Sequence, residues 1–116
     1  MNLYHCMIDL KPNANPLAFA HALEQWMVDL AQAGCVESWR LFRRKLNLAG
    51  PGCADFLLEI EVTELAQLDA AFHYLGLAGH DSEKRYDQMH QMIDRAEFGL
   101  YRPFPDPAGT ERLALV

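Results

Sequence analysis

The sequence predicts an α+β fold of the ferredoxin-like type, with elements in the order β-α-β-β-α-β and an extra short helix before the last strand. The prediction rests on segments that alternate apolar and polar residues, on apolar stripes at helical spacing, and on glycine- or proline-rich turns. The 116 residues suit one domain with its own core. We expect residues 1–102 to form this domain and residues 103–116 to form a proline-containing C-terminal tail.

The first half of the chain predicts a strand over residues 2–9 and then a long amphipathic helix. Asn15 followed by Pro16 is typical of a helix start, because asparagine caps the first turn and proline fits the first helical position. Gly34 is typical of the residue that follows a helix end. The apolar residues between these signals recur every three or four positions: Phe19, Leu23, Trp26, Met27, Leu30 and Ala33.

The second half predicts two strands, two helices and a last strand. Residues 36–48 alternate and predict a strand, residues 49–52 predict a turn, and residues 55–62 alternate cleanly as a third strand. A short helix is expected to start near Asp81, and the last strand is expected over residues 95–101. The helix between the third strand and the short helix is predicted by one apolar stripe: Leu65, Leu68, Phe72 and Leu75.

Helices on one face of the sheet leave the other face open, and strand alternation predicts what that open face carries. A single chain would expose a large apolar patch there, which is typical of an interface. We therefore expect a homodimer in which two open faces pack together, forming a dimeric α+β barrel. The residues expected on the open face mix apolar and charged side chains: Leu3, His5, Met7, Arg40, Phe42, Arg44, Leu46, Leu57, Glu59, Glu61, Glu97 and Tyr101.

The stretch WRLFRRKLNL, residues 39–48, gathers four of the ten Lys and Arg residues of a chain whose formal net charge is −6. Two interpretations stay open for its arginines on the open face. Arg40 and Arg44 pair with the carboxylates of Glu59, Glu61 or Glu97, as most clustered charges do. Alternatively, one of the two arginines binds an anionic ligand such as a carboxylate, which the planar guanidinium suits.

Composition and motifs exclude several classes of function. The sequence pI near 5.2 argues against nucleic acid as a partner, and the absence of a long apolar run argues against a membrane. The first residues do not resemble a signal peptide, so we expect a cytoplasmic protein. The widely spaced Cys6, Cys35 and Cys53 are expected to be reduced. No metal-ligand spacing and no nucleotide loop is present, so we expect no metal and no cofactor.

Four segments resemble a small bacterial family of uncharacterised proteins: YHCMIDLKP, ESWRLFRRKLNL, ELAQLDAAF and FGLYRPFPD. The resemblance covers residues 1–106, and the family belongs to the dimeric α+β barrel superfamily. That superfamily includes cofactor-free monooxygenases, polyketide cyclases and stress-responsive proteins. In the cyclases a histidine on the first strand helps catalysis, with a second histidine before the last strand. The resemblance implies His5 for the first position and His80 or His90 for the second.

The candidate catalytic residues are His5 as a general base and Tyr101 as a donor to a developing oxyanion. The candidate ligand-binding residues are Arg40, Arg44, Phe42 and His90. Each has a plainer interpretation, since a strand histidine is often a packed side chain and His90 shares a helical face with core residues.

Three functions remain open. The first is a small-molecule-binding or stress-associated homodimer whose ligand is aromatic or anionic. The second is a cofactor-independent enzyme, like a monooxygenase or polyketide cyclase, that uses His5 as base. The third is a structural dimer module whose charged face is fully paired.

Overall fold

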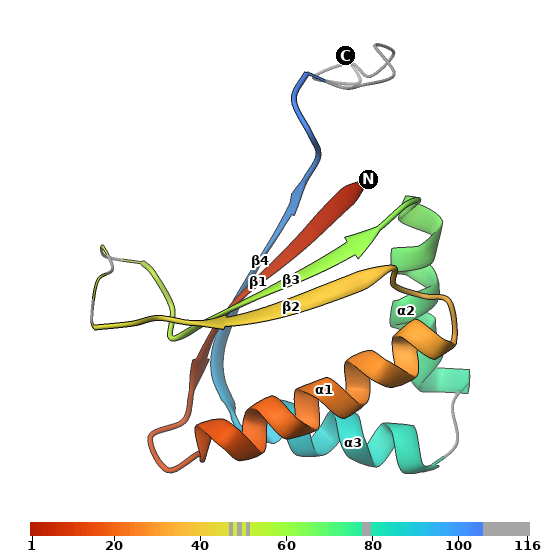
Figure 1. The fold of residues 1–116 in the computed structure, drawn as a ribbon. Coiled ribbons are helices and arrows are strands. Elements are labelled where there is room, and N and C mark those ends of the chain that lie inside the picture. Colours follow the sequence, from red (N-terminus) through yellow and green to blue (C-terminus); the bar gives the residue numbers. More distant parts are fainter. Residues whose placement is uncertain (47, 49, 51, 78–79, 106–116) are drawn as a thin grey trace.

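The computed structural model describes residues 1–46, 48, 50, 52–77 and 80–105, and describes no side chains over 75–77 and 80–82. The turn predicted at 49–52 and the tail predicted at 103–116 therefore lie partly outside the described residues. The elements run along the chain in the predicted order (Figure 1): β1 (Asn2–Leu10), α1 (Pro16–Gln32), β2 (Ser38–Arg43), β3 (Phe56–Val62), α2 (Leu65–Leu77), α3 (His80–Gln91) and β4 (Ile93–Tyr101).

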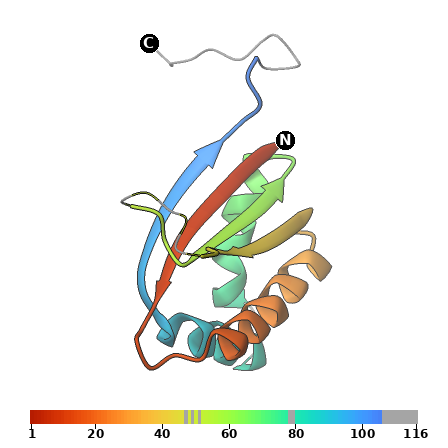
Figure 2. The ribbon, with the colours of Figure 1, turned by 60° about the vertical axis from the view of Figure 1, so that its left-hand side comes forward.

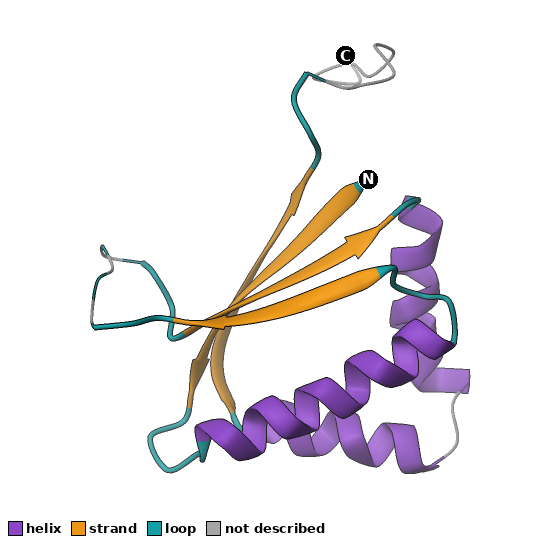
Figure 3. Ribbon diagram, in the orientation of Figure 1, coloured by secondary structure: helices purple, strands orange, loops and turns teal. Residues whose placement is uncertain are grey.

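The four strands form one antiparallel sheet in the order β2-β3-β1-β4. The three described helices lie on the same side of this sheet, and none of them lies on its other side (Figure 3). The turned view shows β4 along one edge of the sheet and β2 along the other (Figure 2). The ferredoxin-like α+β fold predicted from the sequence is thus confirmed.

Helix α1 begins and ends where the sequence signals place its termini. The Asn15 side chain accepts hydrogen bonds from the backbone N–H groups of Leu17, at 2.9 Å, and Ala18, at 3.3 Å. At the other end Gly34 takes a φ of +77°, which a glycine adopts without steric cost. The predicted apolar stripe faces the sheet, with five of its members buried: Phe19, Leu23, Trp26, Met27 and Leu30.

The core lies between α1 and the helix-facing side of the sheet. Alternate residues of β3, from Phe56 to Val62, are buried, and the residues between them are only partly covered. Phe19 and Val62 have no exposed surface, and the rings of Phe19 and Phe56 lie 5.3 Å apart. The faces predicted for the third strand are therefore confirmed.

The second strand is shorter than the predicted range 36–48. Pairing between β2 and β3 stops where Arg43 faces Phe56. Leu46 then takes a positive φ of 55°, a conformation that bends a non-glycine chain out of an extended strand. Leu46 is 85% exposed and does not lie on the sheet, so its predicted place on the open face is wrong.

The helix stripe predicted around Phe72 covers the sheet only in part. Leu68 packs against the core and Ala71 is buried, but Leu65 is 50% exposed and Phe72 is 61% exposed. The Leu75 side chain lies outside the described residues. Phe98 of the edge strand β4 is 64% exposed although it is on the helix side, because α2 packs mainly against β3.

A matched pair of α1 substitutions tests this packing. Phe19→Ala removes a fully buried ring, so we expect the free energy of unfolding to fall by about 3–5 kcal/mol. Leu17→Ala, at a position that is 81% exposed on the same helix, is expected to change it by less than about 0.5 kcal/mol. Urea denaturation followed by circular dichroism measures both values, and equal losses would contradict the assigned helix face.

Candidate functional site

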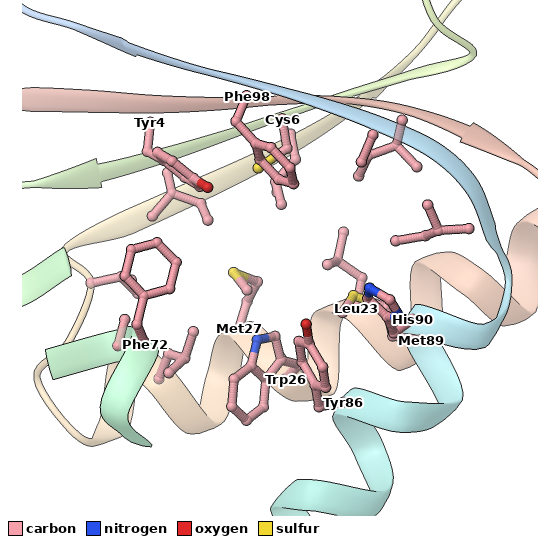
Figure 4. Close-up of a pocket in the computed structure, with 18 of the residues that line it drawn as sticks. Tyr4, Cys6, Leu23, Trp26, Met27, Phe72, Tyr86, Met89, His90 and Phe98 are labelled. Atoms are coloured by element: carbon pink, nitrogen blue, oxygen red, sulfur yellow. The ribbon is translucent and has the colours of Figure 1, made fainter. Parts of the chain in front are cut away.

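A cavity of about 220 Å³ lies between the helix-facing side of the sheet and the three helices. The close-up shows strand side chains on one wall and helix side chains on the other, with open space between them (Figure 4). Most lining residues are apolar, as in small-molecule sites that place a few polar groups in an apolar surround. The polar groups on these walls belong to five residues: Tyr4, Cys6, Trp26, Tyr86 and His90.

Aromatic rings make up much of the cavity wall. The Tyr86 and His90 rings, one helical turn apart on α3, stack with centroids 5.4 Å apart and planes 23° apart. Trp26 of α1 meets the Tyr86 ring edge-on at 5.5 Å. On the sheet side, Tyr4 and Phe98 stack at 5.9 Å with planes only 17° apart. Flat rings on facing walls favour a flat guest, because offset stacking is the preferred geometry of aromatic pairs.

Burial raises the pKa of two of the polar groups, both of which are neutral at neutral pH. Desolvation raises the pKa of the Cys6 thiol to about 12, so it behaves as a small apolar side chain at neutral pH. Desolvation, with a smaller contribution from Cys6, raises the pKa of Tyr4 to about 12. The Tyr4 phenol therefore keeps its proton and acts as a hydrogen-bond donor to a bound oxygen or nitrogen atom.

Two aromatic residues that line the cavity, Phe72 of α2 and Phe98 of the edge strand β4, are more than half exposed, which indicates that the cavity opens to solvent between these elements. The Tyr4 ring stacks on Phe98 and lies edge-on to Phe72, with 6.1 Å between the Tyr4 and Phe72 centroids. The opening is thus framed by aromatic side chains that an entering apolar molecule contacts first.

The open face of the sheet carries a separate row of polar side chains. Glu59 of β3 lies directly opposite Arg40 of β2 and directly opposite His5 of β1. Arg40 donates a hydrogen bond to the Glu59 carboxylate, which confirms one of the predicted pairings. His5 Nε2 lies 3.4 Å from Glu59 Oε1, outside hydrogen-bond geometry, and this buried nitrogen has no hydrogen-bond partner within the described part of the chain.

The Tyr101 ring lies beside His5, in space that the absence of a side chain at Gly99 leaves open. The His5 and Tyr101 rings lie 5.0 Å apart, and Gly99 faces His5 across the β1–β4 pair. A Cβ added at Gly99 would lie 3.1 Å from the Tyr101 ring, closer than ordinary van der Waals contact. The missing side chain at position 99 therefore leaves the space in which the Tyr101 ring folds back toward His5.

The remaining predicted residues lie around this row. Phe42 faces Leu57, and Leu57 faces Met7, so an apolar row crosses three strands beside the polar one. Arg40 also lies 5.3 Å from the Phe42 ring centroid. Arg44, beyond the end of β2, pairs with Asp55 at 3.2 Å and with none of the three glutamates predicted for it.

The structure therefore divides the six predicted site residues between different places. His90 lines the cavity, whereas His5, Tyr101, Arg40 and Phe42 lie on the opposite side of the sheet and Arg44 lies at its end. Sequence reasoning missed Tyr4 and Tyr86 as cavity residues. The four-residue spacing of Tyr86 and His90, which puts both on one side of a helix, was the available signal.

The described residues hold neither a metal-binding cluster nor a membrane-spanning helix. Within residues 1–46, 48, 50, 52–77 and 80–105, no group of three His, Cys, Asp or Glu side chains is arranged to hold a metal ion. None of the helices among those residues is both long enough and apolar enough to span a bilayer.

The chain belongs to the family of unknown function DUF6614, whose model matches residues 1–116. No curated protein matches the chain. The family assignment agrees with the resemblance seen in the sequence, and it brings no activity with it.

Solved structures with the same fold are similar over most of their length. The Arabidopsis thaliana protein At3g17210 has a TM-score of 0.67 at 8% identity, covering 89% of this chain and 95% of that one. SnoaB, a cofactor-independent oxygenase from Streptomyces nogalater, has a TM-score of 0.63 at 12% identity, covering 90% and 97%. A dimeric ferredoxin-like protein of unknown function from Thermobifida fusca has a TM-score of 0.52 at 14% identity, covering 87% and 90%.

Proposed function

We propose that the protein is a homodimer that binds a small aromatic molecule in the cavity between its sheet and helices. The observation that carries this proposal is the cavity itself, which is apolar, walled by aromatic rings and open to solvent beside Tyr4. The volume of about 220 Å³ is small for a ligand site, so the ligand has roughly one or two rings. The Tyr4 phenol donates a hydrogen bond to an oxygen of that ligand, such as a carbonyl or hydroxyl group.

Filling the cavity tests ligand binding. 1-Naphthol, which has two rings and one hydroxyl, is expected to raise the melting temperature of the native protein by mass action. Ala71→Phe places a ring in the cavity wall and is expected to abolish this rise. The adjacent Ala70→Phe adds the same ring on the exposed side of α2 and is expected to preserve it.

Differential scanning fluorimetry measures the three melting curves, with each variant compared to its own ligand-free sample. No shift for the native protein across a panel of one- and two-ring phenols and ketones would contradict the proposal. Equal shifts for the Ala71→Phe and Ala70→Phe variants would show binding elsewhere on the molecule.

The open face supports the homodimer part of the proposal. The apolar row of Phe42, Leu57 and Met7 lies beside the pair of Arg40 and Glu59, so a second copy covers apolar surface without burying an unpaired glutamate. A two-fold contact through this face is isologous, so the same apolar row on each chain contributes to it. The Thermobifida fusca protein, which has the same fold, is dimeric.

A charge placed in the apolar row tests the dimer. Leu57→Glu adds an unpaired carboxylate at the centre of the open face and is expected to weaken association by at least about tenfold. Leu17→Glu, on the exposed side of α1, is the matched control and is expected to leave association unchanged. Sedimentation velocity over a dilution series measures the mass. A native protein that stays monomeric at every concentration would contradict the proposed dimer.

A cofactor-independent enzyme is the second candidate function, and the stacked Tyr86–His90 pair in the cavity favours it. Here His90 accepts a proton from an acidic phenol or C–H group of the ligand, and the electron pair stays on the ligand as an enolate or phenolate. Tyr4 donates a hydrogen bond to the developing oxyanion. The similarity to SnoaB supports this class. His5, proposed as base from the sequence, lies on the other side of the sheet and does not line this cavity.

Oxygen uptake separates the two functions. If the protein is an oxygenase, aerobic incubation with hydroxynaphthalenes consumes oxygen, and His90→Gln is expected to lower the rate by about 10²-fold or more while 1-naphthol still binds. His5→Gln is the matched control, since it changes the same side chain on the far side of the sheet. If the rate of oxygen uptake is unchanged in His90→Gln and lower in His5→Gln, the reaction takes place on the open face and not in the cavity.

A further inference from the structure

A second hollow, separate from the aromatic cavity, lies at the end of the sheet between the start of α1 and the connection from β2 to β3. Its volume is about 410 Å³. Three cationic side chains line it, together with one carboxylate: Lys11, Arg43, Arg44 and Asp55. Three cations against one carboxylate make the lining of this hollow net positive in a chain whose formal net charge is −6, and the nearby Asp9 carboxylate accepts a hydrogen bond from the Asp55 N–H at 2.9 Å without lining the hollow.

Contacts hold the two arginine side chains in place, and among the described residues neither Arg43 nor Lys11 has a carboxylate partner. Arg44 bonds Asp55 at 3.2 Å and the Cys53 carbonyl at 3.5 Å, which fixes its guanidinium and leaves other N–H donors available. Arg43 lies 5.8 Å from the Phe56 ring centroid, a contact that orients the cation without neutralising it. Within the part of the chain that the structure describes, neither Arg43 nor Lys11 forms an ion pair.

The loop that carries Lys11 is also fixed. The Lys11 N–H donates to the Met92 carbonyl at 2.9 Å, and the Ala14 N–H donates to the Lys11 carbonyl at 3.0 Å. The first N–H groups of α1 are already bonded to Asn15, so the side-chain cations supply the attraction in this hollow. A rigid loop and anchored arginines reduce the entropy lost when an anion binds.

We propose that this hollow binds the phosphate group of a small phosphorylated molecule. A phosphate ester carries close to two negative charges at neutral pH and offers three strong acceptor oxygens, which suit the net positive lining and the N–H donors of Arg43, Arg44 and Lys11. The hollow exceeds the size of one phosphate, and its other walls include Pro12, Pro16 and Leu46. Those side chains contact the organic part of the ligand.

Isothermal titration at low ionic strength tests the proposal with two probes, inorganic phosphate and glycerol 3-phosphate. We expect saturable binding of one equivalent per chain, with the ester tighter than the inorganic ion because it also contacts the apolar wall. Arg43→Gln and Lys11→Gln are each expected to weaken binding by about tenfold or more. Lys45→Gln removes the same charge from a residue that does not line the hollow, and is expected to weaken binding by less than about twofold.

Two controls separate loss of the site from loss of folding. Melting curves show whether each variant is folded. Arg43→Lys keeps the charge but loses the guanidinium, so it is expected to bind more tightly than Arg43→Gln and more weakly than the native protein. The cavity-filling Ala71→Phe variant is expected to bind both phosphates normally, so failure of the aromatic cavity and failure of this site are separate results. No saturable heat up to about 10 mM phosphate, or an equal loss for Lys45→Gln and Arg43→Gln, would overturn the proposal.

Discussion

The pairing of the central strand β1 with β3 on one side and β4 on the other decides which strand side chains face the helices and which face away from them. Its register places Cys6 between Leu58 and Phe98 on the helix side, and His5 between Glu59 and Gly99 on the open side. Successive strand residues point to opposite faces, so a shift of one residue would move the cavity side chains to the open face and the charged row into the core. The cavity and the proposed interface therefore depend on the same hydrogen-bonded ladder.

Much of this arrangement could be predicted from the sequence, and the limits have physical causes. The alternation of β3 and the cap of α1 are local signals, and both were confirmed. β1 carries apolar residues at both its odd and its even positions, so alternation did not show which of them face the helices, and Tyr4 was not recognised as a cavity residue. The early end of β2 at Arg43 and the positive φ that follows at Leu46 have no signal in the alternating pattern of residues 36–48. The exposure of Phe72 and Phe98 depends on where α2 packs, which no local pattern encodes.

The two faces and one end of the sheet carry three different surfaces: an apolar cavity, the open face and a cationic hollow. The helix side offers an apolar cavity lined by the protonated Tyr4 phenol, whose pKa burial raises to about 12. On the open side Arg40 pairs with Glu59 beside the apolar side chains that we propose a second copy covers. At the end of the sheet, Arg43 and Lys11 remain without carboxylate partners among the described residues. The basic stretch of residues 39–48 is thus divided between two places. Arg40 lies on the open face, where it pairs with Glu59, and Arg43 and Arg44 line the cationic hollow.

The central claim is that the helix side of the sheet holds a ligand while the open side holds a second chain. A native mass spectrum of the protein purified from its own cells measures both properties in one experiment. The account predicts a species with twice the mass of the chain plus the mass of one small aromatic molecule per chain. A bare monomer at the same concentration would contradict the account on both faces of the sheet.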